Sequence, residues 1–171
     1  MKVEGGVHIA PTVRSLLEVG IPVMGHIGLT PQSLHALGGP RVQGRDEAAA
    51  QRLKDDAIAL QDAGAFAVVL ELVPATLAGA ITKSLTIPTI GIGAGPACDG
   101  QVLVLHDMLG LIAAPTAKFV KVYGDLANAM RDAVARFADD VRRGQYPGPE
   151  HRYPMSDAER AAFADLLDER R

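Results

Sequence analysis

The sequence predicts an α/β protein built around a parallel β-sheet. Short β-rich segments alternate with helical patterns along the chain, which is the order that βαβ units produce. The 18 glycines and 11 prolines among 171 residues indicate many tight connections between short elements. Hydrophobic residues make up 48% of the chain and charged residues 22%, a composition typical of a globular protein and not of a disordered one.

Four predicted strands share short runs of apolar and β-branched residues. They cover residues 2–4, 21–26, 65–73 and 87–92. Helices are predicted in the three intervals between these strands, because apolar side chains recur there at helical spacing. They cover residues 11–19, 46–63 and 75–85. A helix between each two successive strands indicates parallel pairing.

A fifth strand has two candidates, residues 101–105 and residues 119–123, because both segments are apolar and β-branched. We predict the second, since a parallel strand needs a crossover connection that is usually a helix. Asp99, as the N-cap of a helix over residues 99–109, supplies that connection. A further amphipathic helix is predicted over residues 126–143.

The chain is predicted to have two parts, residues 1–143 with the βα units and residues 144–171 with a linker and a short helix. Residues 144–154 contain three prolines and two glycines, a composition typical of a connection that runs over the surface. Ser156 and Glu159 follow with the spacing of a capping box, so the short helix is expected to begin there.

Charge and composition exclude several classes of function. The net charge of −3, with acidic and basic residues interspersed and no tryptophan, disfavours nucleic-acid binding. The apolar runs, such as the one around residues 101–105, are far short of the roughly 20 residues that cross a bilayer. Residues 1–10 show no apolar segment of the kind found in signal peptides, so we expect a cytoplasmic protein. Cys98 is the only cysteine, which excludes an intrachain disulfide and a zinc site of paired cysteines.

Lys2 and Glu4 are the first candidate site residues. They lie two apart on the first predicted strand, so both side chains point to the same face of the sheet. In a parallel α/β barrel the active site lies at the C-terminal ends of the strands, where Glu4 stands. A salt bridge inside the barrel remains an alternative interpretation of this pair.

Glu71 and His26 end two further strands. Glu71 follows the apolar residues 67–70, and a carboxylate there is costly to bury unless it has a partner or a task. His26 ends the predicted second strand, although a structural histidine that bonds to the backbone remains an alternative.

Two glycine-rich segments complete the candidate site. The connection over residues 28–45 is much longer than an ordinary βα loop and is expected to cover the mouth of the site. The glycines at 91, 93 and 95, followed by Asp99, either cradle an anion or mark a close approach of two backbones.

Six sequence segments stand in this order within residues 2–153: KVEGG, GHIGLTPQS, GGPRVQGR, VVLELVP, IPTIGIGAGPACDGQVLVLHD and KFVKVY. Together they are similar to ketopantoate hydroxymethyltransferases. The resemblance implies a (βα)8 TIM barrel of the phosphoenolpyruvate/pyruvate superfamily, of which this chain would form the last five units. It also implies a homo-oligomer, often a decamer. The implied activity is transfer of a hydroxymethyl group from 5,10-methylenetetrahydrofolate to 3-methyl-2-oxobutanoate, which gives 2-dehydropantoate in pantothenate biosynthesis.

The same resemblance implies a role for each candidate residue. Lys2 would bind the keto acid, His26 would lie in the substrate pocket, and Glu71 would be the proton acceptor. Glu4 would sit at a Mg2+ ion, which stabilises an enolate through oxygen ligands. The folate would be a cosubstrate.

The strand of Lys2 would be the fourth of eight in this family. About 90 residues of barrel, with two metal-binding aspartates and a substrate-binding serine, are therefore expected outside this sequence. Met1 stands where an apolar strand residue is expected, which fits a start read at an internal GTG codon. Five strands alone would form an open sheet with unpaired edges, so we expect that the isolated chain is not a stable, active monomer.

Two other functions remain open. Lys2 on a strand with apolar walls is compatible with a Schiff-base aldolase. An inactive fragment that binds only an anion or a sister chain is the alternative that is not an enzyme.

Overall fold

The computed structural model describes residues 1–112 and 116–163, which fall into two compact units. The first unit is Met1–Gly124, and the second begins at Asp125. The structure thus divides the chain before the helix near residues 126–142. The domain boundary predicted from the sequence lies after that helix, between residues 143 and 144, and it stays a prediction. In the described part of the chain, no helix is long and apolar enough to cross a membrane.

The first unit contains a five-stranded sheet in which the strands lie in chain order. The strands are β1 (Lys2–Glu4), β2 (Met24–Gly28), β3 (Ala67–Glu71), β4 (Thr89–Ile92) and β5 (Gly100–Gln101). Every neighbouring pair is parallel. The predicted α/β class is confirmed, and a parallel sheet in chain order is consistent with part of a βα barrel.

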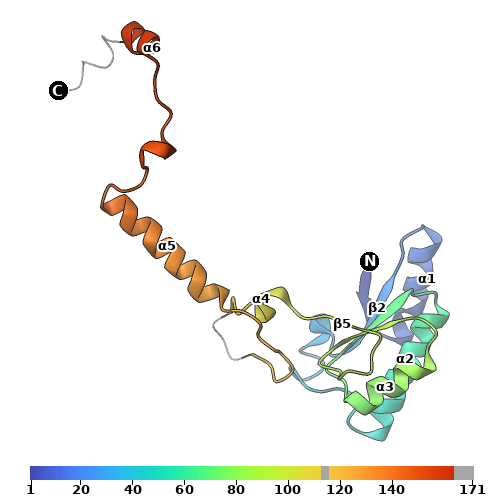
Figure 1. Cartoon of the computed structure of the whole chain (residues 1–171). Helices are drawn as coiled ribbons and strands as arrows, with labels where there is room; N and C mark the ends of the chain where they lie inside the picture. Colours follow the sequence, from blue (N-terminus) through green and yellow to red (C-terminus); the bar gives the residue numbers. More distant parts are fainter. Residues whose placement is uncertain (113–115, 164–171) are drawn as a thin grey trace. The chain divides into compact units, whose positions relative to one another are not determined.

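Three helices connect the first four strands and lie side by side (Figure 1). They are α1 (Ala10–Glu18), α2 (Glu47–Asp62) and α3 (Ala75–Ser84). Short 3-10 turns stand ahead of α1 and within the loop before α2, at Val7–Ile9 (η1) and Pro31–Ser33 (η2). The side chain of Asp46 caps α2 by accepting a hydrogen bond of 2.8 Å from the main-chain N–H of Ala49. All three predicted helices are confirmed.

The prediction for the fifth strand is wrong. The strand that pairs with β4 is β5, through the partners Ile90↔Gly100 and Gly91↔Gln101, and residues 119–123 form a turn and irregular chain. The connection from β4 to β5 needs no helix, because positive φ angles at Gly93 (63°) and Gly95 (78°) let the chain turn back within a few residues.

The helix expected over residues 99–109 is also wrong in its extent. Only α4 (Leu105–Met108) is helical there. Asp99 does not cap it, because its Oδ2 accepts hydrogen bonds from the main-chain N–H of Thr89 (2.8 Å) and from the Thr89 hydroxyl (3.1 Å). Asp99 therefore joins the connection before β5 to the start of β4.

The second unit contains α5 (Leu126–Arg142), η3 (Pro149–His151) and α6 (Asp157–Ala162). The helix predicted over residues 126–143 is confirmed as α5. The predicted capping box is confirmed as well, since Glu159 Oε2 accepts from the Ser156 N–H at 2.8 Å and the Ser156 hydroxyl accepts from the Glu159 N–H at 3.3 Å. The Ser156 hydroxyl, which donates to Glu159 Oε2 at 2.7 Å, and then the Ser156 N–H hold the pKa of Glu159 below its ordinary value.

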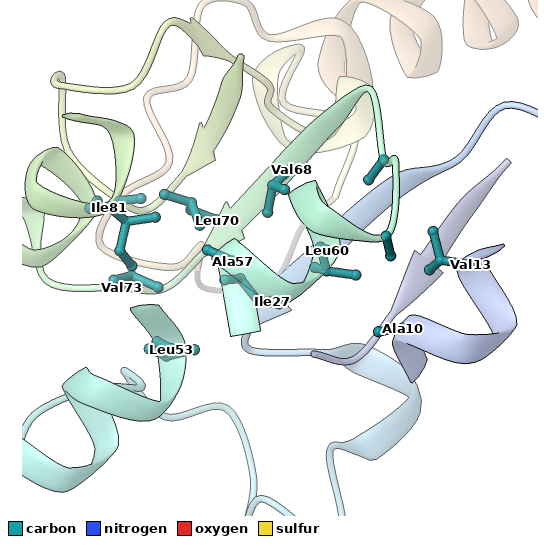
Figure 2. Packing of buried hydrophobic residues seen from close by; sticks show 14 of the residues in the cluster. Ala10, Val13, Ile27, Leu53, Ala57, Leu60, Val68, Leu70, Val73 and Ile81 are labelled. Carbon is teal, nitrogen blue, oxygen red and sulfur yellow. The ribbon is translucent and has the colours of Figure 1, made fainter. Parts of the chain in front are cut away.

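The hydrophobic core lies between the sheet and α1–α3. Figure 2 shows Leu60 of α2 with Ile27 and Val68 of the sheet, and all three side chains are buried. A Cβ atom on Gly25 would lie 2.6 Å from Leu60 Cδ1, so α2 packs on β2 where the strand has no side chain. Since side chains alternate along a strand, Gly25, Ile27 and Val68 face the helices and their neighbours face the other side.

Candidate active site

The face of the sheet opposite the helices carries the four residues predicted from the sequence. Glu4 of β1 pairs with His26 of β2, and Glu71 of β3 pairs with Gly28 of β2. Residues 2, 4, 26 and 71 therefore share one face. Glu4 and Glu71 end their strands as predicted, whereas His26 lies two residues before the end of β2 instead of closing it.

Short distances join these residues into one group, called here the four-residue cluster. Lys2 Nζ lies 2.7 Å from His26 Nδ1 and 3.6 Å from Glu4 Oε1. His26 Nδ1 lies 3.7 Å from the same Glu4 oxygen. On the other side of the ring, His26 Nε2 lies 3.1 Å from Glu71 Oε2. His26 is thus the link between the first strand and Glu71.

The contact with Lys2 determines which nitrogen of a neutral His26 ring carries hydrogen. An ammonium group only donates, so Nδ1 accepts from Lys2 and Nε2 bears the N–H. Nε2 is buried and makes no hydrogen bond with any residue that the structure describes, because Glu71 Oε2 is close but out of line with the ring N–H. A buried unpaired donor costs about 1–3 kcal/mol. This ring does not match a structural histidine with both nitrogens paired, and it has a donor ready for an oxygen of a ligand.

Glu4 is held by the long connection after β2. Its Oε2 accepts a hydrogen bond of 2.9 Å from the main-chain N–H of Gln32, and its side chain is only 8% exposed. Lys2 is 46% exposed, so its 3.6 Å contact with Glu4 is a weak surface interaction by itself. The sequence does not reveal the part of Gln32, because every residue except proline has a main-chain N–H.

Glu71 is positioned by a close approach of two backbones. Gly28 has a φ of 91°, and a Cβ atom there would lie 2.2 Å from the carbonyl oxygen of Glu71. That oxygen accepts a hydrogen bond of 2.8 Å from the N–H of Leu29. Only glycine fits at position 28, since any side chain would push β2 and β3 apart just where Glu71 meets His26.

The residues around Glu4 do not by themselves form a Mg2+ site. Within the described ranges, no group of three or more His, Cys, Asp or Glu side chains is placed to hold a metal ion. The oxygen of Glu4 that Gln32 leaves free faces the Lys2 ammonium and the His26 ring, not further carboxylates. Mg2+ requires near-octahedral oxygen coordination, which one carboxylate oxygen beside an ammonium group does not supply.

The glycine-rich segment that begins in β4 and continues beyond it packs against the protein's own side chains. Added Cβ atoms would lie 3.0 Å from Cys98 Sγ at Gly91, 2.9 Å from Phe119 at Gly93 and 2.4 Å from Ala75 at Gly95. No helix begins at Asp99 to present main-chain N–H groups to an anion. The close-approach interpretation therefore fits this segment, and the anion cradle does not.

A cavity of about 290 Å³ lies on the helical side of β2. Its walls include Ile27 and Gly28 of β2, Arg52 and Leu53 of α2, and Gln43 of the long connection, but none of the four-residue cluster. The connection over residues 28–45 thus lines this cavity and also reaches the cluster through Gln32.

Comparison with known proteins agrees with the sequence motifs. A family model described as ketopantoate hydroxymethyltransferase matches residues 1–149. A 3-methyl-2-oxobutanoate hydroxymethyltransferase of Chloroflexus aurantiacus is 60% identical over 169 residues, which cover 99% of this chain and 60% of that protein. A protein of the same name from Nitratidesulfovibrio vulgaris is 55% identical over 170 residues, covering 99% of this chain and 55% of that protein.

The chain therefore spans between 55% and 60% of the length of these two curated relatives. A third similar protein, the 3-methyl-2-oxobutanoate hydroxymethyltransferase of Acidothermus cellulolyticus, is 62% identical over 154 residues, which cover 90% of this chain and 56% of that protein. With a family model matched over most of its length, the chain belongs to the ketopantoate hydroxymethyltransferase family.

Proposed function

We propose that the four-residue cluster is part of the active site of a 3-methyl-2-oxobutanoate hydroxymethyltransferase. The observation that carries the proposal is the contact of the buried His26 ring with both Lys2 and Glu71, at the end of a parallel sheet where such enzymes place their chemistry. Relatives with 55–60% identity that bear this enzyme's name support it. The substrates are a small keto acid and a folate carrying a one-carbon unit.

The reaction first breaks the C3–H bond of 3-methyl-2-oxobutanoate. Glu71, whose side chain is 17% exposed at the end of an apolar strand, takes that proton. The electrons of the broken bond form an enolate, whose carbon attacks the methylene carbon of the folate. This attack breaks one of the two C–N bonds of that carbon, and water then replaces the second nitrogen and supplies the hydroxyl oxygen of the product. The two folate nitrogens take the proton held by Glu71 and one proton of the water, so the folate leaves as tetrahydrofolate. No oxidant or reductant is needed.

Lys2 and His26 act on the charge that this step creates. The Lys2 ammonium lies at the half-exposed side of the cluster, where it attracts the negatively charged oxygens of the keto acid and of its enolate. The unpaired N–H of His26 offers a directed donor beside the base. Both groups are held in advance by their contacts with each other, so little reorganisation is needed when charge develops.

Mg2+ is part of the proposal only for the complete protein. Its principal ligands would come from residues outside this chain, with Glu4 beside the ion, and no step here depends on it. A homo-oligomer in the cytoplasm is proposed on the same basis, from the family resemblance.

A Schiff-base aldolase is not favoured. Lys2 is 46% exposed and lies between a ring nitrogen and a carboxylate, whereas a Schiff-base lysine works best when desolvated among apolar groups. The inactive binding fragment is not favoured either, because it gives no reason for an unpaired donor beside Glu71.

The test uses the full-length product of the gene that encodes this chain, called here the full-length product. Incubation with 3-methyl-2-oxobutanoate, 5,10-methylenetetrahydrofolate and Mg2+ should yield 2-dehydropantoate, measured by mass spectrometry, and omission of any one component should stop it. Borohydride should not label Lys2 irreversibly in the presence of the keto acid. Absence of product from the folded protein would refute the proposed function.

A further inference from the structure

The residue after Glu71 has an unusual backbone conformation. Leu72 has a φ of 49° and is the one non-glycine residue with positive φ in the described segments. Leucine disfavours this left-handed region, because its Cβ approaches the backbone. Such a residue persists only where its surroundings hold it, and residues of this kind gather at functional sites.

Two hydrogen bonds hold Leu72 in this conformation. Its N–H donates to the carbonyl oxygen of Ile92 at 2.9 Å, and its carbonyl oxygen accepts from the main-chain N–H of Gln43 at 2.8 Å. The preceding carbonyl, of Glu71, accepts from the N–H of Leu29. The two carbonyl groups that directly follow the Glu71 Cα are therefore held by the β2–α2 connection, near its two ends.

Gln43 is itself fixed in place by the next residue. Gly44 has a φ of 78°, and a Cβ atom there would lie 2.6 Å from Leu77 of α3 and 2.8 Å from Leu53 of α2. The connection is thus seated between these two helices immediately after Gln43. The Gln43 side chain is not part of the contact, since its Nε2 donates to the Arg41 carbonyl in the same connection.

We infer that Gln43 is a positioning residue for Glu71, acting through its main-chain N–H. By holding the Leu72 carbonyl, Gln43 keeps Leu72 left-handed, and this sets the direction in which the chain leaves β3. The direction in turn keeps the Glu71 carboxylate against His26. The catalytic consequence rests on the proposed function, whereas the geometric claim does not.

A matched pair of variants separates the N–H group from the side chain. Gln43→Pro removes the N–H donor, and Gln43→Ala keeps it. In the full-length product, Gln43→Pro should lower kcat on the order of ten- to a hundredfold with KM changed by less than about threefold, because the base is displaced by a fraction of an ångström. Gln43→Ala should stay within about twofold of the unchanged protein.

A second readout needs no activity. The ring nitrogens of His26, followed by 15N NMR at one fixed pH, report the nearby Glu71 carboxylate. Gln43→Pro should move the His26 signals toward those of Glu71→Gln, and Gln43→Ala should leave them in place. If the full-length product makes no 2-dehydropantoate, the proposed function fails, yet these signals still decide whether Gln43 positions Glu71.

A rescue variant tests whether Gln43 acts by keeping Leu72 in the left-handed conformation. Glycine occupies positive φ without steric cost, so adding Leu72→Gly to Gln43→Pro should recover part of the lost kcat. If Gln43→Pro does not fold, hydrogen exchange of the unchanged protein decides. The Gln43 N–H should exchange much more slowly than those of Arg41 and Arg45, two exposed residues of the same connection whose N–H groups make no hydrogen bond within the described residues. Unchanged His26 signals in a folded Gln43→Pro, equal effects of the two Gln43 variants, or rapid exchange at Gln43 would each overturn the inference.

Discussion

Replacing Gly25 by alanine tests how the core determines the position of the site. The added Cβ would lie 2.6 Å from Leu60 Cδ1 and 3.3 Å from its Cγ, on a fully buried side chain. Overpacking of this kind costs about 1–3 kcal/mol. Loss of the glycine's freedom in the unfolded chain offsets about 0.4–1 kcal/mol of that. We therefore expect Gly25→Ala to lower the free energy of unfolding by about 1.3 kcal/mol, the centre of the roughly 0–2.6 kcal/mol that the difference of those ranges spans.

The side chain that the added Cβ would overlap, Leu60, can be truncated in a separate variant. Leu60→Ala alone should cost about 2–5 kcal/mol, through lost burial and the cavity that it leaves. In the double variant the alanine at position 25 no longer meets Leu60 and fills part of that cavity. The double variant should thus be more stable than the sum of the single effects by about 1 kcal/mol or more.

Denaturant unfolding of the full-length product measures this cycle. Gly79→Ala is the matched control, because Gly79 lies within α3 and its added Cβ would meet only the Ala97 Cβ, at 3.1 Å. Alanine in a helix interior should leave stability unchanged or raise it slightly. Additive effects at positions 25 and 60, within about 0.5 kcal/mol, would refute the packing of α2 on β2 described above.

Three further outcomes are expected. Lys2→Ala should raise the KM for the keto acid at least tenfold, while Lys83→Ala in α3 should not; equal KM values would remove Lys2 from the substrate site. The N–H and then the hydroxyl of Thr89 hold the pKa of Asp99 below its ordinary value of 3.8, so Asp99 adds stability above that value that is lost as pH falls through the lowered pKa. Asp99→Asn should accordingly lower the denaturant midpoint at pH 7, and its difference from the unchanged protein should shrink below about pH 4; a constant difference would contradict the assignment. Titration of the 171-residue chain with Mg2+ should give no binding heat, whereas the full-length product should bind Mg2+ and lose activity in EDTA; heat from the short chain would contradict the ligand assignment.

The elements that the sequence predicts well have strong local signals. The first four strands and α1–α3 follow from apolar periodicity and from the glycines and prolines around them. Glu71 stands out because a carboxylate ends an apolar strand, and Lys2 and Glu4 stand out because they lie two apart on one strand. Pairing in register then brings residues 2, 4, 26 and 71 together. Predicting a parallel sheet whose strands lie in chain order requires little more than these local signals.

The parts that the sequence does not predict depend on contacts without a residue signature. A two-residue strand such as β5 is too short to show a periodicity. Asp99 is mistaken for an N-cap because its true partner, Thr89, lies ten positions away and leaves no local sequence pattern. The N–H groups of Gln32 and Gln43 are main-chain groups that any residue but proline could supply. The left-handed backbone of Leu72 is held by its hydrogen bonds to Gln43 and Ile92, although leucine by itself disfavours positive φ.

The central claim is that Glu71 removes the C3 proton of the keto acid. In D2O with the folate omitted, the full-length product should exchange that proton of 3-methyl-2-oxobutanoate for deuterium, which NMR measures directly. Glu71→Gln should slow the exchange on the order of a hundredfold or more while keto-acid binding changes by less than about threefold, and the exposed control Glu18→Gln should exchange at the unchanged rate. Exchange at the full rate in Glu71→Gln, or a large rise in KM at unchanged kcat, would contradict the account.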